Sequence, residues 1–218
     1  KKIYGTATRP RLAVHRTNKH FSMQLIDDDL GHTIAAASSV EGDMRSTSGA
    51  TRLGVEKMPP AVTRGLLLDV VGLRGRPLHG GEVVSRADLE ACLAVAQLEI
   101  EPGDAVLLHT GWLAAQQGVS DIDFNTEPGI DYEAGLWLAQ RDVALIGADN
   151  YAVEVLPFAE GTVFPVHQCV IRDFGIPLLE GLLLEPLVRT GRREFLFVAA
   201  ALPIVGATGS PLTPLAIL

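Results

Sequence analysis

The sequence predicts an α/β domain, and two observations indicate this class. From Thr51 onward, short apolar segments alternate with segments that carry apolar residues at helical spacing. Polar residues follow the apolar segments directly, as at His109 and at Asp149, and loops at strand ends are common places for a binding site. The 218 residues are 47% hydrophobic and 20% charged, which suits one globular domain over residues 1–218 with a sizeable core.

The first predicted strand is the apolar run GLLLDVV, residues 65–71. A helix is expected over residues 85–100, because Ser85 is a good N-cap and Asp88 follows three residues later. A Pro-Gly-Asp turn then leads into a second strand, Ala105–His109. The apolar face of the helix comprises Leu89, Cys92, Leu93 and Ala96.

The alternation continues toward the carboxyl terminus. Asp131–Arg141 suits a helix with Leu136 and Trp137 turned inward, and VALIGADN, residues 143–150, suits a third buried strand. Two further segments are expected, a short helix over residues 167–175 and a long strand, Glu194–Ile204. In contrast, residues 1–50 show no clear periodicity, and residues 35–49 are small and polar enough to form a loop.

Charge and cysteine content exclude several classes of protein. The formal net charge of −8 argues against general affinity for nucleic acid or anionic membranes, since both attract basic surfaces. The densest basic group, Arg189, Arg192 and Arg193, is typical of a solvated turn. No apolar run is long enough to span a bilayer. Cys92 and Cys169 do not have the spacing of a metal or redox pair, so a reducing cytoplasm is the expected location.

Five phrases occur in an order that is characteristic of one family. They are TRLGVEKMPPAVTRGLLLDV, LLHTGW, GADNYAVEVLP, FPVHQ with a following Glu, and ATGSPLTPLAI. Together, over roughly residues 51–218, they resemble the putative cyclase family, which includes bacterial kynurenine formamidase and isatin hydrolase. The resemblance implies a swivelling β/β/α cyclase-family domain that forms a homodimer or homotetramer. It also implies a divalent metal, zinc or manganese, and hydrolysis of a small cyclic amide, lactone or ester.

The family's signature is His-x-Gly-Thr-His-x-Asp-x-x-x-His. Its first two histidines and its aspartate bind metal, and its last histidine serves in acid–base catalysis. The nearest match is IDDDLGH, which makes Asp28 a candidate metal ligand and His32 a candidate catalytic residue. The two earlier histidine positions fall on Ser22 and Ile26, which bind no metal. Either the site is degenerate, or residues of the natural protein are missing between positions 20 and 51.

A histidine and a carboxylate interrupt the apolar stretch FPVHQCVIRDFGIPLLEG. His167 and Glu180, thirteen residues apart, resemble the family's distal His and Glu, which implies that both bind metal and that His167 also transfers protons. A short helix and a turn between them could bring both side chains to one point. From local sequence alone, a lone histidine near a proline, such as His167, is most often a structural residue, and Glu180 could instead cap a strand or pair with an arginine.

Two further side chains are candidates for substrate binding. His109 stands where relatives often have arginine before Thr-Gly-Trp, and it either faces the pocket or is structural. Trp112 either stacks on an aromatic substrate or belongs to the core. Asp149 and Asn150 are expected to hold backbone at the end of a strand rather than to perform chemistry.

The first hypothesis for function is a metal-dependent cyclase-family hydrolase, in which metal-bound water attacks the carbonyl of a small-molecule substrate. Two alternatives stay open. One is a metal-independent acid–base cyclase or dehydratase of secondary metabolism. The other is a catalytically inactive member of the family that serves in binding. No nucleic acid and no membrane are expected as partners.

Overall fold

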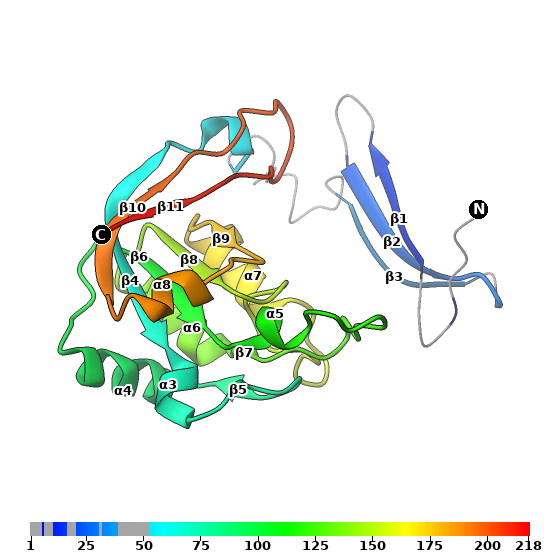
Figure 1. Cartoon of the computed structure of the whole chain (residues 1–218). Coiled ribbons are helices and arrows are strands. Elements are labelled where there is room, and N and C mark those ends of the chain that lie inside the picture. The colour runs from blue at the N-terminus through cyan, green and yellow to red at the C-terminus, as the bar shows by residue number, and fades with distance from the viewer. Residues whose placement is uncertain (1–5, 7–10, 17–20, 31, 39–52) are drawn as a thin grey trace. The chain divides into compact units, whose positions relative to one another are not determined.

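The computed structural model describes residue 6 and residues 11–16, 21–30, 32–38 and 53–218 (Figure 1). The chain divides into two compact units, and each is described by itself. The small unit comprises Lys1–Met58 with Pro203–Ser210, and the large unit comprises Pro59–Leu202 with Pro211–Leu218.

A six-stranded sheet forms the centre of the large unit, in the order β11-β10-β4-β6-β8-β9. Four neighbouring strands, β4, β6, β8 and β9, are parallel, while β10 runs antiparallel to both β4 and β11. A mixed α/β domain was predicted, and this class is confirmed. The strands are β4 (Ala61–Asp69), β6 (Ala105–His109), β8 (Leu145–Ala148), β9 (Leu178–Leu179), β10 (Glu194–Ala199) and β11 (Leu215–Ile217).

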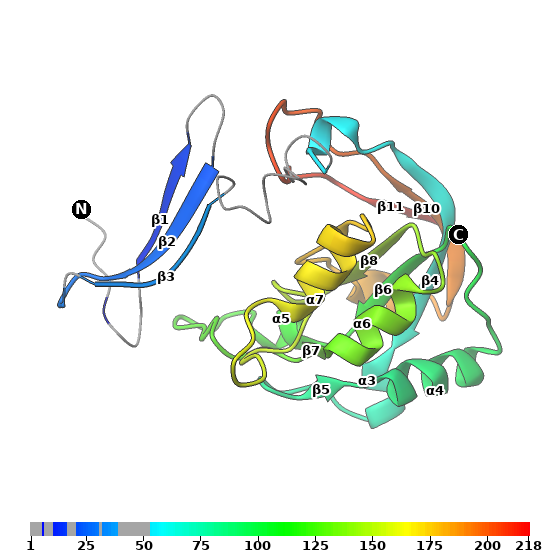
Figure 2. The ribbon, with the colours of Figure 1, turned by 180° about the vertical axis from the view of Figure 1, so that it is seen from behind.

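Alternating side chains of the parallel strands enter two separate cores. Leu66, Leu108 and Ile146 pack on one face, with buried side chains from α4, α6 and the segment around α7. On the other face, Leu67 and Leu107 pack with Leu187 of α8 and with Phe195 and Phe197 of β10. Figure 2 shows α4, α6 and α7 on the near side of the sheet.

The helices of the large unit are short, and among the described residues none combines the length and apolar character needed to cross a bilayer. They are α3 (Val70–Arg74), α4 (Arg86–Ala96), α5 (Trp112–Ala115), α6 (Tyr132–Ala139), α7 (Pro165–His167), which continues as a π-helical segment (Gln168–Asp173), and α8 (Glu185–Arg189). A small parallel pair, β5 (Val83–Val84) and β7 (Gly129–Ile130), accompanies them.

Local signals placed several elements correctly. The strand Ala105–His109 has the predicted bounds, and Ser85 caps α4 in a reciprocal capping box with Asp88. In α6, Trp137 is buried as predicted, while Leu136 is only half-buried. Asp131 is the N-cap of that helix and accepts a hydrogen bond from the Ala134 amide.

Three predicted strands extend too far, and one of them, predicted over residues 143–150, is β8 (Leu145–Ala148). The first ends at Asp69, because the Asp69 carboxylate accepts a hydrogen bond from the Gly72 amide and so caps α3. The last ends at Ala199 instead of Ile204, because Ala199 pairs with Ala61, the first residue of β4, and the ladder has no partner beyond it.

An antiparallel three-stranded sheet, β1 (Arg11–Arg16), β2 (Phe21–Asp27) and β3 (His32–Ser38), lies in the small unit. The sequence did not predict it. Residues 35–38 belong to β3, so the loop expected over residues 35–49 is wrong at its start, and residues 39–49 lie outside the described residues. A 3-10 turn, Val55–Lys57, also belongs to this unit, and the Val55 amide donates to the Ala207 carbonyl oxygen.

Candidate functional site

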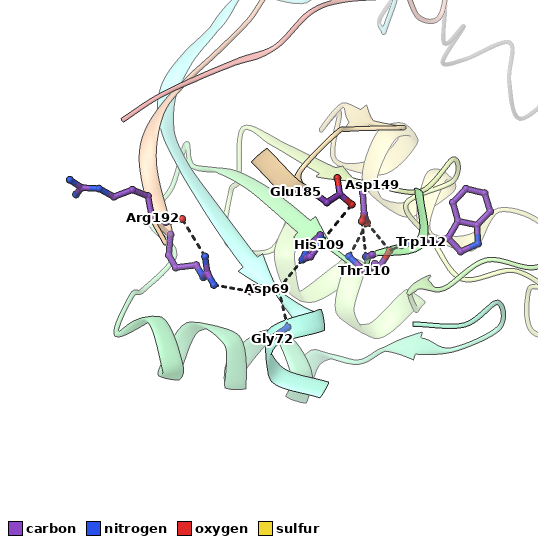
Figure 3. Close-up of polar contacts among 10 residues, drawn as sticks. Asp69, Gly72, His109, Thr110, Trp112, Asp149, Glu185 and Arg192 are labelled. Atoms are coloured by element: carbon purple, nitrogen blue, oxygen red, sulfur yellow. Dashed lines mark hydrogen bonds and ion pairs between the residues drawn. The ribbon is translucent and has the colours of Figure 1, made fainter. Parts of the chain in front are cut away.

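Three polar side chains end the parallel strands of the large unit. Asp69 ends β4 opposite His109 at the end of β6, and Asp149 directly follows β8. Side chains two residues apart in a strand lie on the same face of the sheet, so all three share the face of Leu67 and Leu107, which packs against α8. Glu185 is the first residue of α8. We call Asp69, His109, Asp149, Glu185 and Arg193 the strand-end cluster. Figure 3 labels the first four of these residues.

His109 is held in one orientation within this cluster. Its Nδ1 lies 2.8 Å from Oδ1 of Asp69, and its Nε2 lies 3.9 Å from Oε1 of Glu185. Arg193 donates from Nη2 to the other oxygen of Asp69 over 2.7 Å. Burial alone would lower the pKa of His109, but the hydrogen bond to Asp69 and the charges of Asp149 and Glu185 raise it. The same hydrogen bond lowers the pKa of Asp69.

Asp149 organises the turn after β6. Its Oδ1 accepts hydrogen bonds from the amide and the hydroxyl of Thr110, and its Oδ2 accepts one from the Gly111 amide. Burial raises the pKa of Asp149 despite these donors. Asn150 accepts from the Val153 amide in the same way. The prediction that Asp149 and Asn150 hold backbone at a strand end is therefore confirmed.

A second group of polar side chains surrounds His167, and we call His167, Glu154, Glu180 and Glu127 the His167 centre. Nδ1 of His167 lies 2.5 Å from Oε1 of Glu154, and Nε2 lies 3.3 Å from Oε1 of Glu180. Glu154 is fully buried and also accepts from the backbone amides of Val166 and His167. Burial opposes the charged imidazolium, but the two carboxylates outweigh it and raise the pKa of His167 to about 9.

Glu127 adds a third carboxylate to the His167 centre. It is 1% exposed, and Oε2 accepts a hydrogen bond from the Tyr151 amide, while Oε1 is buried without a partner among the described residues. Burial, together with the charges of Glu180 and Glu154, raises its pKa to about 7. Glu127 can therefore exchange a proton near neutral pH.

Two groups of aromatic rings belong to the large unit. Trp112, Phe124 and Tyr151 form edge-on and tilted contacts, with centroids 5.0 to 6.4 Å apart. Phe164 contacts both Phe158 and the His167 ring. Trp112 is only 3% exposed, so its indole packs within its aromatic group, and its role in substrate binding stays a prediction.

The predicted site residues are distributed over both units. His167 and Glu180 converge, as their spacing suggested, and His109 lies in the strand-end cluster. Asp28 belongs to the turn between β2 and β3, and His32 is the first residue of β3, so both lie in the small unit and no geometry relates them to His167. The metal and catalytic roles assigned to Asp28, His32, His167 and Glu180 stay predictions.

Sequence reasoning missed four carboxylates: Asp69, Glu127, Glu154 and Glu185. A signal existed for Asp69, which interrupts the apolar run GLLLDVV as Glu180 interrupts IPLLEG. Glu127, in the polar stretch NTEPG, had no such signal, because only the fold buries it.

The two groups differ in what they could offer a metal ion. His109, Asp149 and Glu185 each have one ligand atom within 4.8 Å of the others. The His167 centre brings two donors together, Nε2 of His167 and the Glu180 carboxylate, with Glu154 behind the imidazole. Catalytic zinc is usually held by three protein ligands, so this pair amounts to part of a metal site.

Comparison with known proteins identifies a family over most of the chain. A family model described as "Putative cyclase" matches residues 20–155. The crystal structure of a novel cyclase is 35% identical with a TM-score of 0.67, and the alignment covers 79% of this chain and 60% of that one.

More distant structures share the fold. An isatin hydrolase bound to the product analogue thioisatinate is 20% identical with a TM-score of 0.60, covering 72% of this chain and 60% of that one. Isatin hydrolase A from Ralstonia solanacearum is 23% identical with a TM-score of 0.59, covering 73% and 62%. A potential metal-dependent hydrolase with cyclase activity is 22% identical with a TM-score of 0.53, covering 73% and 67%. The chain thus spans about 60% of the length of the first structures it matches.

A different protein matches a shorter part of the chain. The large ribosomal subunit protein uL18 of Acaryochloris marina is 46% identical over 93 residues, which cover 40% of this chain and 78% of that protein. The chain therefore combines likeness to a cyclase with likeness to a ribosomal protein.

Proposed function

The chain belongs to the putative cyclase family, and a shorter part of it belongs to the uL18 family. From the cyclase membership we propose that the large unit is the catalytic part of a hydrolase. The substrate is a small cyclic amide, lactone or ester. The observation that carries the proposal is the position of His167 between Glu154 and Glu180. Structures of isatin hydrolases and of a potential metal-dependent hydrolase share the fold, which supports the reaction class.

We assign separate tasks to the residues of the His167 centre. Glu154 accepts from Nδ1 of His167 and fixes the ring, so Nε2 points toward Glu180, whose side chain is 43% exposed. With a pKa raised to about 9, His167 carries a proton at neutral pH and can donate it to the leaving nitrogen or oxygen. Glu180 accepts the proton of the attacking water, and the carbonyl carbon bonds to the water oxygen as its bond to the leaving group breaks.

A zinc or manganese ion would fit the His167 centre only in part. His167 and Glu180 would provide two ligands, and such an ion would polarise the substrate carbonyl and acidify water. Asp28 and His32, the remaining candidates, belong to the other unit, so we base no step on a metal at this position.

Site-directed variants test the proposal in the full chain with panels of isatin-like cyclic amides, lactones and aryl esters. Glu180→Gln keeps the shape of the side chain and removes its charge, and it should lower kcat by about 100-fold or more with a small change in Tm. Glu133→Gln, which changes an exposed glutamate of α6, is the matched control. Equal activity of Glu180→Gln and the wild type would refute this role for Glu180.

The assay also separates the two alternatives. Ring closure or loss of water from a substrate, unchanged by chelators, would favour a metal-independent cyclase or dehydratase. If the protein converts none of the three substrate classes but binds one class tightly, the inactive binding protein would be favoured.

A second candidate function concerns the amino-terminal part of the chain. The cyclase-like phrases begin only at Thr51, so we infer that the likeness to uL18 lies toward the amino terminus, and we propose that this part associates with the large ribosomal subunit. The expectation of no nucleic-acid partner rested on the charge of the whole chain, but residues 1–20 contain no Asp or Glu. Their basic residues, which suit phosphate contacts, are Lys1, Lys2, Arg9, Arg11, Arg16 and Lys19.

Co-sedimentation of the full chain with purified large ribosomal subunits tests this second candidate. The protein should pellet with the subunits at low salt and less so at high salt, because phosphate contacts release counterions. The combined variant Arg9→Glu, Arg11→Glu and Arg16→Glu should lose this association, while Arg189→Glu with Arg192→Glu should keep it. Absence of co-sedimentation at low salt, or equal pelleting of both variants, would reject the proposal.

A further inference from the structure

The strand-end cluster contains a set of metal-binding side chains outside the His167 centre. We propose that His109, Asp149 and Glu185 bind a divalent transition-metal ion of the zinc or manganese class. One donor atom of each residue lies within 4.8 Å of the other two. The cluster faces α8, whereas Val166, the neighbour of His167, packs into the core on the opposite face of the sheet. The two groups share no residue, and we treat them as separate sites.

The orientation of His109 is that of a metal ligand. Metal-bound histidines commonly donate their second ring N–H to a carboxylate, which fixes the tautomer and directs the other nitrogen at the ion. Asp69 occupies this position at 2.8 Å from Nδ1, and Arg193 holds Asp69 from behind at 2.7 Å. Nε2 of His109 is consequently directed toward Glu185 (Figure 3).

Glu185 is incomplete without a further partner. Both of its carboxylate oxygens are buried, and neither accepts a hydrogen bond among the described residues. Among the described residues, Nε2 of His109 lies 3.9 Å from Oε1 of Glu185, which is too long for a hydrogen bond. A buried carboxylate without a partner is costly, whereas coordination of a cation would satisfy it.

The charges of the cluster also call for a cation. Asp69, Asp149 and Glu185 contribute three carboxylates, and Arg193 contributes one guanidinium, so two negative charges are left when His109 is neutral. One divalent ion would balance them. Within the part of the chain that the structure describes, Oδ2 of Asp149 accepts one hydrogen bond, from the Gly111 amide, which leaves a lone pair for coordination.

The donor atoms, which lie within 4.8 Å of one another, would have to move together to bind a transition metal. Zinc binds imidazole nitrogen and carboxylate oxygen at about 2.0–2.2 Å, so neighbouring ligand atoms in a tetrahedral site lie about 3.4 Å apart. The His109–Glu185 separation of 3.9 Å would therefore have to close by about half an ångström. A site with one imidazole and two carboxylates suits zinc or manganese better than the all-oxygen site that calcium prefers.

Calorimetric titration of the metal-stripped full chain with Zn²⁺, and separately with Mn²⁺, tests this site. The wild type should show saturable binding, and Glu185→Gln should weaken it by about tenfold or more. His109→Gln, a second variant, should do the same. Zn²⁺ should also raise the Tm of the wild type more than that of Glu185→Gln.

Two controls locate the ion. Glu160→Gln should bind as the wild type does, and Glu180→Gln should keep the site, because Glu180 belongs to the His167 centre. The proposal is overturned if neither metal binds, if Glu185→Gln and His109→Gln bind like the wild type, or if Glu180→Gln alone removes the binding. No substrate enters the titration, so its outcome is independent of the hydrolase activity.

Discussion

Glu127 is expected to make the stability of the large unit depend on pH. Its pKa rises from 4.5 to about 7 on folding, because the carboxylate is buried and the charges of Glu180 and Glu154 oppose its ionisation. A group with a raised pKa contributes its stability in full below the unfolded value of 4.5. That contribution is lost as the pH rises through about 7, since the folded state must then bury a charge.

The size of the effect follows from the shift. One pKa unit corresponds to about 1.4 kcal/mol, so the shift corresponds to about 3 kcal/mol. Glu127→Gln keeps the shape and the acceptor for the Tyr151 amide but cannot ionise. We therefore expect the free energy of unfolding of the variant, relative to the wild type, to rise by about 3 kcal/mol between pH 4.5 and pH 8.

Urea denaturation at several pH values, followed by tryptophan fluorescence, measures this difference. Other groups titrate over the same range, but their contributions largely cancel when variant and wild type are compared at the same pH. Glu160→Gln, at an exposed position, should show no comparable trend. A difference between Glu127→Gln and wild type that stays constant from pH 4.5 to pH 8 would refute the reasoning.

Three further predictions concern other parts of the large unit. Ser85→Ala should lower the free energy of unfolding in urea denaturation by about 1 kcal/mol, because α4 loses its capping box. Thr190→Ala, at the exposed C-cap of α8, does not share this mechanism. Asp69→Asn should weaken zinc binding in calorimetry by about tenfold, because His109 loses the carboxylate that orients it; unchanged affinity would show that Asp69 has no such role. We also propose that the chain forms a homodimer or homotetramer through the exposed apolar strand β11. Leu215→Lys should therefore lower the molar mass measured by light scattering, and a monomeric wild type would contradict the proposal.

Several elements could be predicted from the sequence because their signals act within a few residues. Ser85 and Asp88 define the start of α4 through contacts three residues apart, and the apolar run Ala105–His109 forms a strand buried on both faces. The sequence identified His167 and Glu180 as candidate site residues because charged or titratable groups are rare in apolar stretches. The small unit escaped prediction because RLAVHR and FSMQLID mix polar and apolar residues without clear alternation.

The sequence by itself determined the α/β class, the main strands and helices, and the distal His167–Glu180 pair. Only the tertiary structure decided which carboxylates accompany each histidine. Asp69 contacts His109, 40 positions away in the sequence, because β4 and β6 are paired in parallel and their ends lie side by side. Arg193 contacts Asp69, 124 positions away, because β10 pairs with β4 on its other side. Burial of Glu127 and Glu185 depends on the same packing, so no local pattern could have shown that Oε1 of Glu127 and both carboxylate oxygens of Glu185 have no hydrogen-bond partner among the described residues.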